Sequence, residues 1–147
     1  HRYRERYIDK PVKDWHMQSS HRTIAYPHVA LPASKVLEYR RLCQEIASEN
    51  HMRVLEYALW TQPELFSMIL VDIALENSGS ESQMSKTIDH ILRLAHDMGG
   101  SMEYVHGVGV KLIHLMPEEL GSGIDVLRGI KASLDPHNIM NPGKLAL

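Results

Sequence analysis

Apolar residues recur every three or four positions in two stretches of the chain, which is the spacing of one face of an α-helix. In the first stretch the apolar positions are Val36, Leu37, Tyr39, Leu42, Cys43, Ile46 and Ala47. In the second stretch they are Met84, Ile88, Ile91, Leu92, Ala95 and Met98. We predict one helix that begins at Pro32 and stops near His51, and a second that begins after Ser80 and ends at Gly99-Gly100.

Runs of apolar, β-branched and aromatic residues lie between these helices and predict strands. The run over residues 23–31 is interrupted by Pro27, which confines that part to an edge, a bulge or a strand end. Residues 52–60 and 65–75 are separated by a short polar segment and predict a hairpin. Residues 101–105 predict a fourth strand, whose position in the sheet stays open.

The predicted elements follow the order strand, helix, strand, strand, helix, strand. This order is that of a ferredoxin-like split βαβ unit, an antiparallel sheet with two helices on one face, so the fold class is α+β. Beyond this unit, residues 110–116 predict a helix that Pro117 ends or restarts. A further amphipathic helix is predicted over residues 124–134, and Asp135-Pro136 stops it.

Length and charge narrow the class of protein. The 147 residues are enough for one compact domain. The net charge of -2 argues against a nucleic-acid binder, because neutralising phosphates requires a basic face. No apolar run reaches the length of a membrane span. The only cysteine, Cys43, excludes an internal disulfide and is predicted to be a buried thiol, and we expect a cytoplasmic location.

The start of the chain indicates a longer polypeptide. The sequence begins with His1 rather than methionine and opens on a basic segment. We predict that residues 1–22 are an N-terminal connecting segment and that residues 23–147 form the domain. The glycine-rich segment that holds a dinucleotide phosphate after a strand is not found, so we expect the chain alone to bind such a cofactor poorly.

Two short blocks in the last third carry the candidate chemistry. In residues 99–109, His106 stands on a glycine-flanked turn before a predicted helix, where a neutral imidazole near the positive helix end is suited to accept a proton. Residues 135–144 end in Asn141-Pro142-Gly143-Lys144, in which proline limits φ and glycine permits a turn. This loop is expected to aim Asn141 and Lys144 at a ligand.

In this order and spacing, the two blocks and residues 130–136 resemble the C-terminal domain of the FAD-linked oxidases. That superfamily includes vanillyl-alcohol oxidase, D-2-hydroxyacid dehydrogenases, glycolate oxidase and alkyldihydroxyacetonephosphate synthase. The resemblance implies oxidation of an alcohol or hydroxyacid by hydride transfer to FAD, which an N-terminal FAD-binding domain absent from this chain would mainly hold. It implies that His106 is a base or orienting residue, and that Asn141 and Lys144 contact the cofactor.

One branch of that family binds a metal through two histidines of a hairpin, His-x-Gly-Asp-Gly-Asn-x-His, and a glutamate just before the motif histidine. In this chain Trp60, Ser67 and Val105 stand at those three positions, so no family-type metal is expected. The resemblance then implies a bulkier substrate pocket for an alcohol, phenol or lipid-like molecule, with Trp60, Phe66 and the nearby Glu103. The other interpretation is that the hairpin aromatics belong to the core.

Two further functions stay open. In the alkyl-transferring branch the flavin forms a covalent adduct without net redox change, but its histidine run before the glycine turn is replaced here by Tyr104 and Val105, which favours the oxidase. The second alternative is a non-catalytic α+β module for dimerisation or ligand binding, because the fold alone does not decide function. The expected partners are therefore the FAD-binding domain, a small-molecule substrate and, as a further option, a second copy of the chain.

Overall fold

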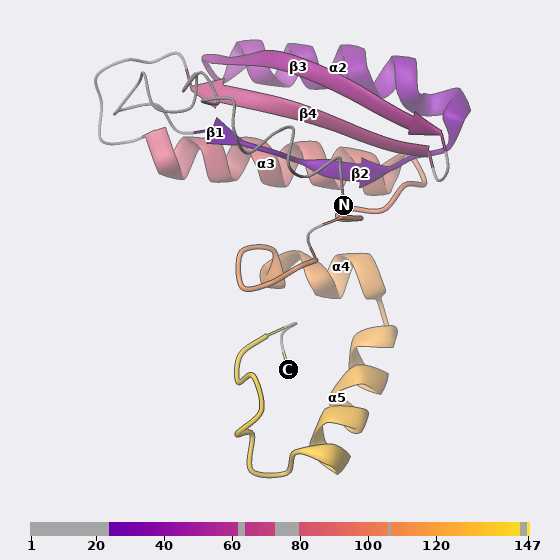
Figure 1. The fold of residues 1–147 in the computed structure, drawn as a ribbon, viewed down its shortest axis with the longest axis vertical. Helices are drawn as coiled ribbons and strands as arrows, with labels where there is room; N and C mark the ends of the chain where they lie inside the picture. Colours follow the sequence, from indigo (N-terminus) through magenta and orange to yellow (C-terminus); the bar gives the residue numbers. More distant parts are fainter. Residues whose placement is uncertain (1–23, 62–63, 73–79, 106, 145–146) are drawn as a thin grey trace, which may run out of the picture.

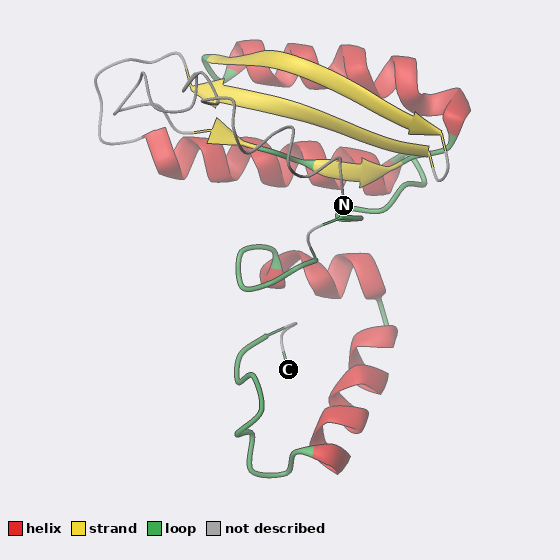
Figure 2. Cartoon of the chain, in the orientation of Figure 1, coloured by secondary structure: helices red, strands yellow, loops and turns green. Residues whose placement is uncertain are grey.

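A computed structural model of the chain describes residues 24–61, 64–72, 80–105, 107–144 and 147 (Figure 1). The elements in chain order are β1 (Ile24–Ala25), β2 (His28–Ala30), the 3-10 helix η1 (Ala33–Lys35), α2 (Val36–Glu49), β3 (Met52–Thr61), β4 (Glu64–Asp72), α3 (Ser80–Asp97), the 3-10 helix η2 (Ile113–Leu115), α4 (Met116–Leu120) and α5 (Gly123–Leu134). Figure 2 shows a unit of strands with two long helices, from which the shorter helices and the C-terminal tail extend away.

The central strand of the sheet is β4, and all of its pairings are antiparallel. β3 pairs with one side of β4, starting with Met52 opposite Asp72. β1 and β2 both pair with the other side. They are two pieces of one strand, separated by Tyr26 and Pro27, so the prediction of a strand broken by proline is confirmed.

The predicted fourth strand over residues 101–105 is wrong, because only a single bridge forms there. Ser101 and Ala30 exchange two backbone hydrogen bonds of 2.9 and 3.3 Å, and the Tyr104 N–H then donates to the His28 carbonyl at 3.2 Å. Ser101 and Tyr104 are three residues apart, whereas their partners Ala30 and His28 are only two apart. The segment therefore has one extra residue relative to β2, which interrupts the ladder. The segment still follows the free edge of β2, where a split βαβ unit has its last strand.

The two long helices cover one face of the sheet (Figure 1). The Tyr39 hydroxyl of α2 donates to the Ile91 carbonyl of α3 over 3.0 Å, and both residues are fully buried. Alternate side chains of β4, those of Phe66, Met68 and Leu70, are at most 2% exposed and form the core beneath these helices. The predicted α+β fold, with two helices on one face of an antiparallel sheet, is confirmed.

The inner face of α2 contains the buried thiol that the sequence predicts. Cys43 is fully buried, and burial raises the pKa of its thiol to about 12, although a hydrogen bond with Tyr39 opposes the shift. Leu37 was expected on the same face, but it is 78% exposed, so that part of the prediction is wrong. It lies in the first turn of α2, on the side away from the buried Val36 and Tyr39.

The two glycines after α3 end the helix as predicted. Gly99 has a φ of +82° and donates to the His96 carbonyl, while the Gly100 N–H donates to the Ala95 carbonyl, both over 2.8 Å. Gly100 also passes very close to β2. A Cβ atom at this position would lie 2.3 Å from the Ala30 oxygen and 2.8 Å from the Ala95 oxygen. A side chain therefore does not fit where α3 turns back to the sheet edge.

The helix predicted over residues 110–116 begins later than expected. Residues 110–112 form a turn, η2 starts at Ile113, and α4 follows with Pro117 in its first turn. Proline is favoured there because that N–H has no helical partner, so the helix restarts rather than ends at Pro117. α5 forms where it was predicted, and the N–H of Asp135 donates to the Lys131 carbonyl at its end.

Charged side chains attach η2 and α4 to α3. The pairs are Arg93 with Glu118 (Nε–Oε2, 2.7 Å), His114 with Asp89 (Nε2–Oδ2, 2.7 Å) and His96 with Glu119 (Nδ1–Oε2, 3.2 Å). Arg93 also donates from its Nη2 to Glu118 at 3.1 Å, and this hydrogen-bonded pair lowers the pKa of Glu118. Glu119 accepts the Met102 N–H at 3.2 Å, so α4 also holds the segment after Gly100.

The apolar face predicted for α5 consists of Ile124, Leu127, Ile130 and Leu134, and the described residues cover only its first part, since Leu127 is half-buried. Ile124 is buried at the start of the helix, whereas Val126, Ile130 and Leu134 are 64%, 51% and 76% exposed. Their spacing of four residues places them along one side of α5. We call residues 126, 130 and 134 the exposed stripe of α5.

Candidate functional site

The residues singled out from the sequence lie in three places. Trp60 and Phe66 belong to the β3–β4 hairpin, Glu103 to the segment after α3, and Asn141 and Lys144 to the tail after α5, while His106 lies outside the described residues. The hairpin belongs to the sheet, and α5 with the tail extends away from it (Figure 1). The hairpin and tail residues are therefore not brought together within this chain.

Phe66 is a core residue in the structure. Its side chain is 2% exposed, and its ring meets Tyr39 edge-on at a centroid distance of 5.4 Å and lies tilted against Tyr57 at 5.7 Å. Arg40 lies over the ring of Tyr57, with its guanidinium carbon 4.7 Å from the ring centre. The geometry at Phe66 supports the interpretation that this hairpin aromatic packs the core.

The sheet has a second face, away from α2 and α3, which we call the outer face. Because Phe66 and Met68 point into the core, Leu65 and Ser67 of β4 occupy the outer face. Register places Trp60 opposite Leu65 and Ala58 opposite Ser67. Trp60 is therefore at an outer-face position, and its side chain is not among those described.

Glu103 organises the backbone next to the candidate base. Its Oε1 accepts the Val105 N–H at 2.7 Å, which folds the chain into a turn directly before residue 106. After that residue, Gly107 and Gly109 have φ values of +71° and +55°, which glycine adopts without strain. The glycines with positive φ therefore lie after residue 106, whereas the turn before it is formed by Glu103 and Val105.

The expected helix end beside His106 is absent. The first helical residue after it is Ile113, in a 3-10 helix of three residues, and residues 107–112 are loop and turn. A helix dipole acts only near the first turn of a helix. The structure therefore does not support the expectation that a helix end keeps the His106 imidazole neutral. The surroundings that remain are the turn at Glu103 and the two glycines.

Asp135 fixes the start of the tail, a role that we did not predict. Its buried carboxylate accepts the N–H groups of Ile139 at 2.9 Å and Met140 at 2.8 Å, and pairs with Lys131. Lys131 also donates to the Met140 carbonyl. The hydrogen bond from Lys131, together with those from the Met140 and Ile139 amides, lowers the pKa of Asp135. The sequence signal was an acid after a helix, four residues beyond a lysine.

We call these interactions of Asp135 with Lys131, Ile139 and Met140 the Asp135 clamp. A tight turn follows it at Asn141-Pro142-Gly143-Lys144. The Lys144 N–H donates to the Asn141 carbonyl at 3.3 Å, Pro142 is in the second position, and Gly143 has a φ of +72°. These are the features of a type II turn, which needs a positive φ at its third position. Asn141 and Lys144 are both exposed, so an amide and an ammonium group are presented at the surface.

We expect Asp135→Asn to loosen this tail. An amide cannot pair with Lys131, so hydrogen exchange at the Ile139 and Met140 amides should be faster in the variant at neutral pH. In the wild type the folded pKa lies below the unfolded value of about 3.9, so the stabilisation is complete above that value. It is lost as the pH falls through the folded pKa, and the variant should not show this loss.

The matched control is Asp125→Asn, which removes an exposed carboxylate that pairs with Arg128 at 3.1 Å on the same helix. We expect this variant to exchange like the wild type, because exposed pairs contribute little. Unchanged protection at Met140 in Asp135→Asn would contradict the clamp.

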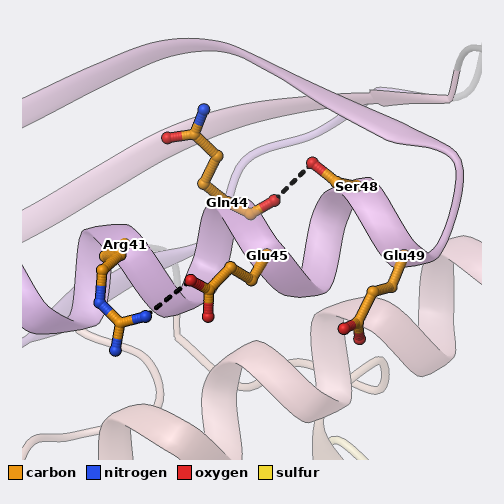
Figure 3. A pocket seen from close by; sticks show the side chains of 5 residues that line it. All are labelled: Arg41, Gln44, Glu45, Ser48 and Glu49. Carbon is orange, nitrogen blue, oxygen red and sulfur yellow. Dashed lines mark hydrogen bonds and ion pairs between the residues drawn. The ribbon is translucent and has the colours of Figure 1, made fainter.

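A hollow on the solvent side of α2 does not belong to this site (Figure 3). It has a volume of about 400 Å³ and is lined by Arg41, Gln44, Glu45, Ser48 and Glu49. Arg41 pairs with Glu45 at 2.6 Å, and the Ser48 hydroxyl donates to the Gln44 carbonyl at 2.8 Å. All five residues belong to one helix, and the two interactions among them are typical of surface residues.

Comparison with known proteins decides the family. A family model described as "FAD linked oxidases, C-terminal domain" matches residues 2–145. The chain belongs to this family. The match covers residues 103–109, the Asp135 clamp and Asn141–Lys144. It also runs across the predicted domain boundary between residues 22 and 23, which stays a prediction because residues 1–23 lie outside the described part.

Curated members of the FAD-linked oxidases share limited identity with this chain. A D-lactate dehydrogenase of Archaeoglobus fulgidus is 30% identical over 115 residues, which are 78% of this chain and 25% of that protein. The glycolate oxidase subunit GlcD of Bacillus subtilis is 27% identical over 116 residues, 78% of this chain and 24% of that protein. The chain therefore spans about a quarter of the length of these relatives.

The family is FAD-linked by its description, and the tail has groups that suit such a cofactor. Flavin ring carbonyls and phosphates are hydrogen-bond acceptors, and the exposed Asn141 amide and Lys144 ammonium are donors. The turn that presents them is fixed by Asp135, so their positions are defined without a ligand. These two residues therefore fit a contact with FAD.

The metal of one family branch does not fit this chain. Trp60 and Ser67 occupy outer-face positions of the hairpin, and Val105 is 49% exposed. An indole, a hydroxyl and an isopropyl group do not form a zinc-type ligand set. Among the described residues, no three His, Cys, Asp or Glu side chains are grouped to hold a metal ion.

In the described part of this FAD-linked oxidase domain, none of the helices has both the length and the apolar composition needed to cross a bilayer.

Proposed function

We propose that this chain is the substrate-side domain of an FAD-dependent oxidoreductase that oxidises an alcohol or a 2-hydroxy acid to the carbonyl compound. The observation that carries the proposal is the family match over residues 2–145. Two relatives are named D-lactate dehydrogenase and glycolate oxidase subunit, and lactate and glycolate are both 2-hydroxy acids. These names support 2-hydroxy acids as the substrate class proposed for this chain. The same names favour a redox reaction over the alkyl transfer or the non-catalytic module considered from the sequence.

When bound, FAD supplies the acceptor for the hydride that leaves the hydroxyl-bearing carbon of the substrate. His106 takes the hydroxyl proton, so that the oxygen forms the new carbonyl as the C–H bond breaks. Glu103 orients the peptide before His106 through its bond to Val105, and Gly107 lets the chain turn after it. The Asn141 amide and the Lys144 ammonium hold acceptor oxygens of the cofactor.

The decisive experiment uses the complete polypeptide that contains this chain. The purified flavoprotein is mixed anaerobically with D-lactate, glycolate and simple alcohols, and bleaching of the flavin absorbance is followed. We expect at least one 2-hydroxy acid or alcohol to reduce the flavin. A polypeptide that neither contains nor binds FAD would overturn the proposal.

A cytoplasmic location also stays a prediction, since one relative from Danio rerio is named as mitochondrial.

The exposed stripe of α5 is a surface that supports a proposal for where the FAD-binding domain docks. These apolar side chains lie on the helix whose end holds the Asp135 clamp, and thus next to the proposed cofactor contacts. The relatives are about four times as long as the matched part, so further domain surface is present in such proteins. We therefore propose that the FAD-binding domain of the same polypeptide covers Val126, Ile130 and Leu134.

Replacing Ile130 and Leu134 together with aspartate is expected to reduce the FAD retained by the full polypeptide about tenfold or more. Two charges would have to be buried against the partner domain, and a loss of about 1.4 kcal/mol corresponds to that factor. The measurement is the flavin absorbance that remains after gel filtration.

Ala132→Asp is the matched control, because this exposed residue lies on the opposite side of α5 from residue 130. It should retain FAD like the wild type. If the double variant keeps its FAD but changes a dimer into a monomer, the stripe binds a second copy and the proposed docking is wrong.

A further inference from the structure

Three exposed apolar side chains are held around one buried carboxylate at the end of α5. Leu134, Ile139 and Met140 are 76%, 79% and 62% exposed, whereas Asp135 is 7% exposed. Leu134 precedes Asp135 in the chain, and the Asp135 carboxylate accepts the N–H groups of the other two. We call Leu134, Ile139 and Met140 the apolar tip. Single exposed apolar residues are common on protein surfaces, but a group of them marks an interaction site.

The backbone of the tail fixes the apolar tip in place. The chain turns back at Asn138, which has a φ of +49° and donates its N–H to the Asp135 carbonyl at 3.0 Å. Asparagine adopts this left-handed conformation more readily than most residues. The N–H groups of Ile139 and Met140 bind the carboxylate over 2.9 and 2.8 Å, and the Met140 carbonyl accepts a hydrogen bond from Lys131. The backbone is therefore hydrogen-bonded where the side chains are exposed.

This arrangement has the properties of a preformed binding surface. Because the backbone groups are already hydrogen-bonded, covering the apolar tip removes few unpaired polar groups from water. Because the Asp135 clamp fixes the tail, a partner does not have to order it, and such ordering lowers affinity. Burial of the apolar side chains therefore contributes to binding with small opposing costs.

The described residues of this chain do not cover the apolar tip, which lies at the end of the molecule farthest from the sheet (Figure 1). The chain matches only 25% and 24% of the length of two relatives, so most of such a protein lies outside the matched part. Asn141 and Lys144, the proposed cofactor contacts, directly follow Met140 in the tail turn. The partner that fits the apolar tip is therefore the domain that holds the FAD.

From this geometry we propose that the apolar tip packs against the FAD-binding domain of the same polypeptide, on an apolar surface beside the cofactor. The inference rests on the proposed function and extends the docking surface from the exposed stripe of α5 along the tail. In this position the apolar tip excludes water next to Asn141 and Lys144. Hydrogen bonds from these two residues to cofactor oxygens are stronger in such an environment.

Methionine oxidation measures whether the apolar tip is covered. Hydrogen peroxide transfers one oxygen atom to an exposed thioether, which becomes the sulfoxide, and water is the other product. The complete flavoprotein is treated with dilute peroxide together with a short methionine peptide, and sulfoxide formation is followed by mass spectrometry. We expect Met140 to react about tenfold or more slowly than the peptide, like the core residue Met68, which is 2% exposed. A Met140 rate equal to that of the peptide would overturn the proposal.

A double truncation measures the contribution of the apolar tip to cofactor binding. Ile139→Ala combined with Met140→Ala keeps both N–H donors to Asp135 and removes only exposed side-chain atoms. We expect the Kd of the complete polypeptide for FAD to rise about tenfold, because the apolar contact with the FAD-binding domain is lost. Leu37→Ala is the matched control, since this side chain is 78% exposed on α2 and should leave the Kd unchanged. A wild-type Kd in the double variant would contradict the proposal.

Further outcomes separate this inference from the proposed function. A complete polypeptide that neither contains nor binds FAD contradicts the proposed function itself. A flavoprotein that its substrate reduces, but in which peroxide reaches Met140 freely, excludes only the docking of the apolar tip. If Met140 is protected only at concentrations at which gel filtration shows a dimer, a second copy covers the apolar tip and the proposal is wrong. An unchanged melting temperature in the double variant shows that its higher Kd is not caused by unfolding.

Discussion

Flavin reduction in the complete polypeptide should slow about 100- to 10,000-fold when His106 is replaced by alanine. General-base catalysis by a positioned imidazole contributes an effect of this size, and the variant leaves the substrate hydroxyl proton without an acceptor. The measurement is the rate of anaerobic flavin bleaching at saturating substrate. Because the lost group acts on the chemical step, the retained FAD and the visible spectrum should be unchanged.

His90→Ala serves as the control for His106→Ala, since it removes an exposed imidazole from α3 and should leave the rate unchanged. The pH dependence gives a second measure. The wild-type rate should rise with pH as the base loses its proton, and this rise should disappear in His106→Ala. A variant that reduces its flavin at the wild-type rate would exclude His106 as the base.

The largest effect on folding is expected from Gly100→Ala. The new methyl group would lie 2.3 Å from the Ala30 oxygen and 2.8 Å from the Ala95 oxygen, and both contacts are with backbone that cannot rotate away. We expect the free energy of unfolding to fall by about 3 kcal/mol, because α3 and β2 must move apart. Thermal unfolding followed by circular dichroism measures this change.

Gly129→Ala is the matched control. Gly129 lies inside α5 and has no atom within 4 Å of its added Cβ. Alanine favours the helix by up to about 1 kcal/mol over glycine, so this variant should be as stable as the wild type or more stable. Equal melting temperatures for the two alanine variants would show that a side chain at position 100 does not lower the stability of the fold.

The main elements of this fold were predictable because local signals and packing agree. The period of α2 and α3, the proline between β1 and β2, and Gly99 at the end of α3 all point to the same structure. The prediction of a fourth strand was wrong for a reason that no local sequence pattern shows. Residues 101–105 have strand-forming composition, but one extra residue against β2 and the turn at Glu103 interrupt the ladder.

The candidate site was only partly predictable. The tail motif correctly indicated a presented turn, whereas the acid that fixes it was interpreted only as a helix stop. Asp135 acts through the amides of Ile139 and Met140, and a sequence does not show which backbone groups a carboxylate reaches. Periodicity also shows that α5 has an apolar face without naming what covers it.

The buried thiol of α2 has a practical consequence for measuring domain motion. With a pKa of about 12, Cys43 is almost entirely protonated at neutral pH and shielded by the helices, so alkylating reagents should not modify it in the folded state. A cysteine introduced on the exposed tail would then be the one reactive thiol of this domain. Fluorophores or spin labels attached there can report the distance between the tail and the flavin without first removing the native cysteine.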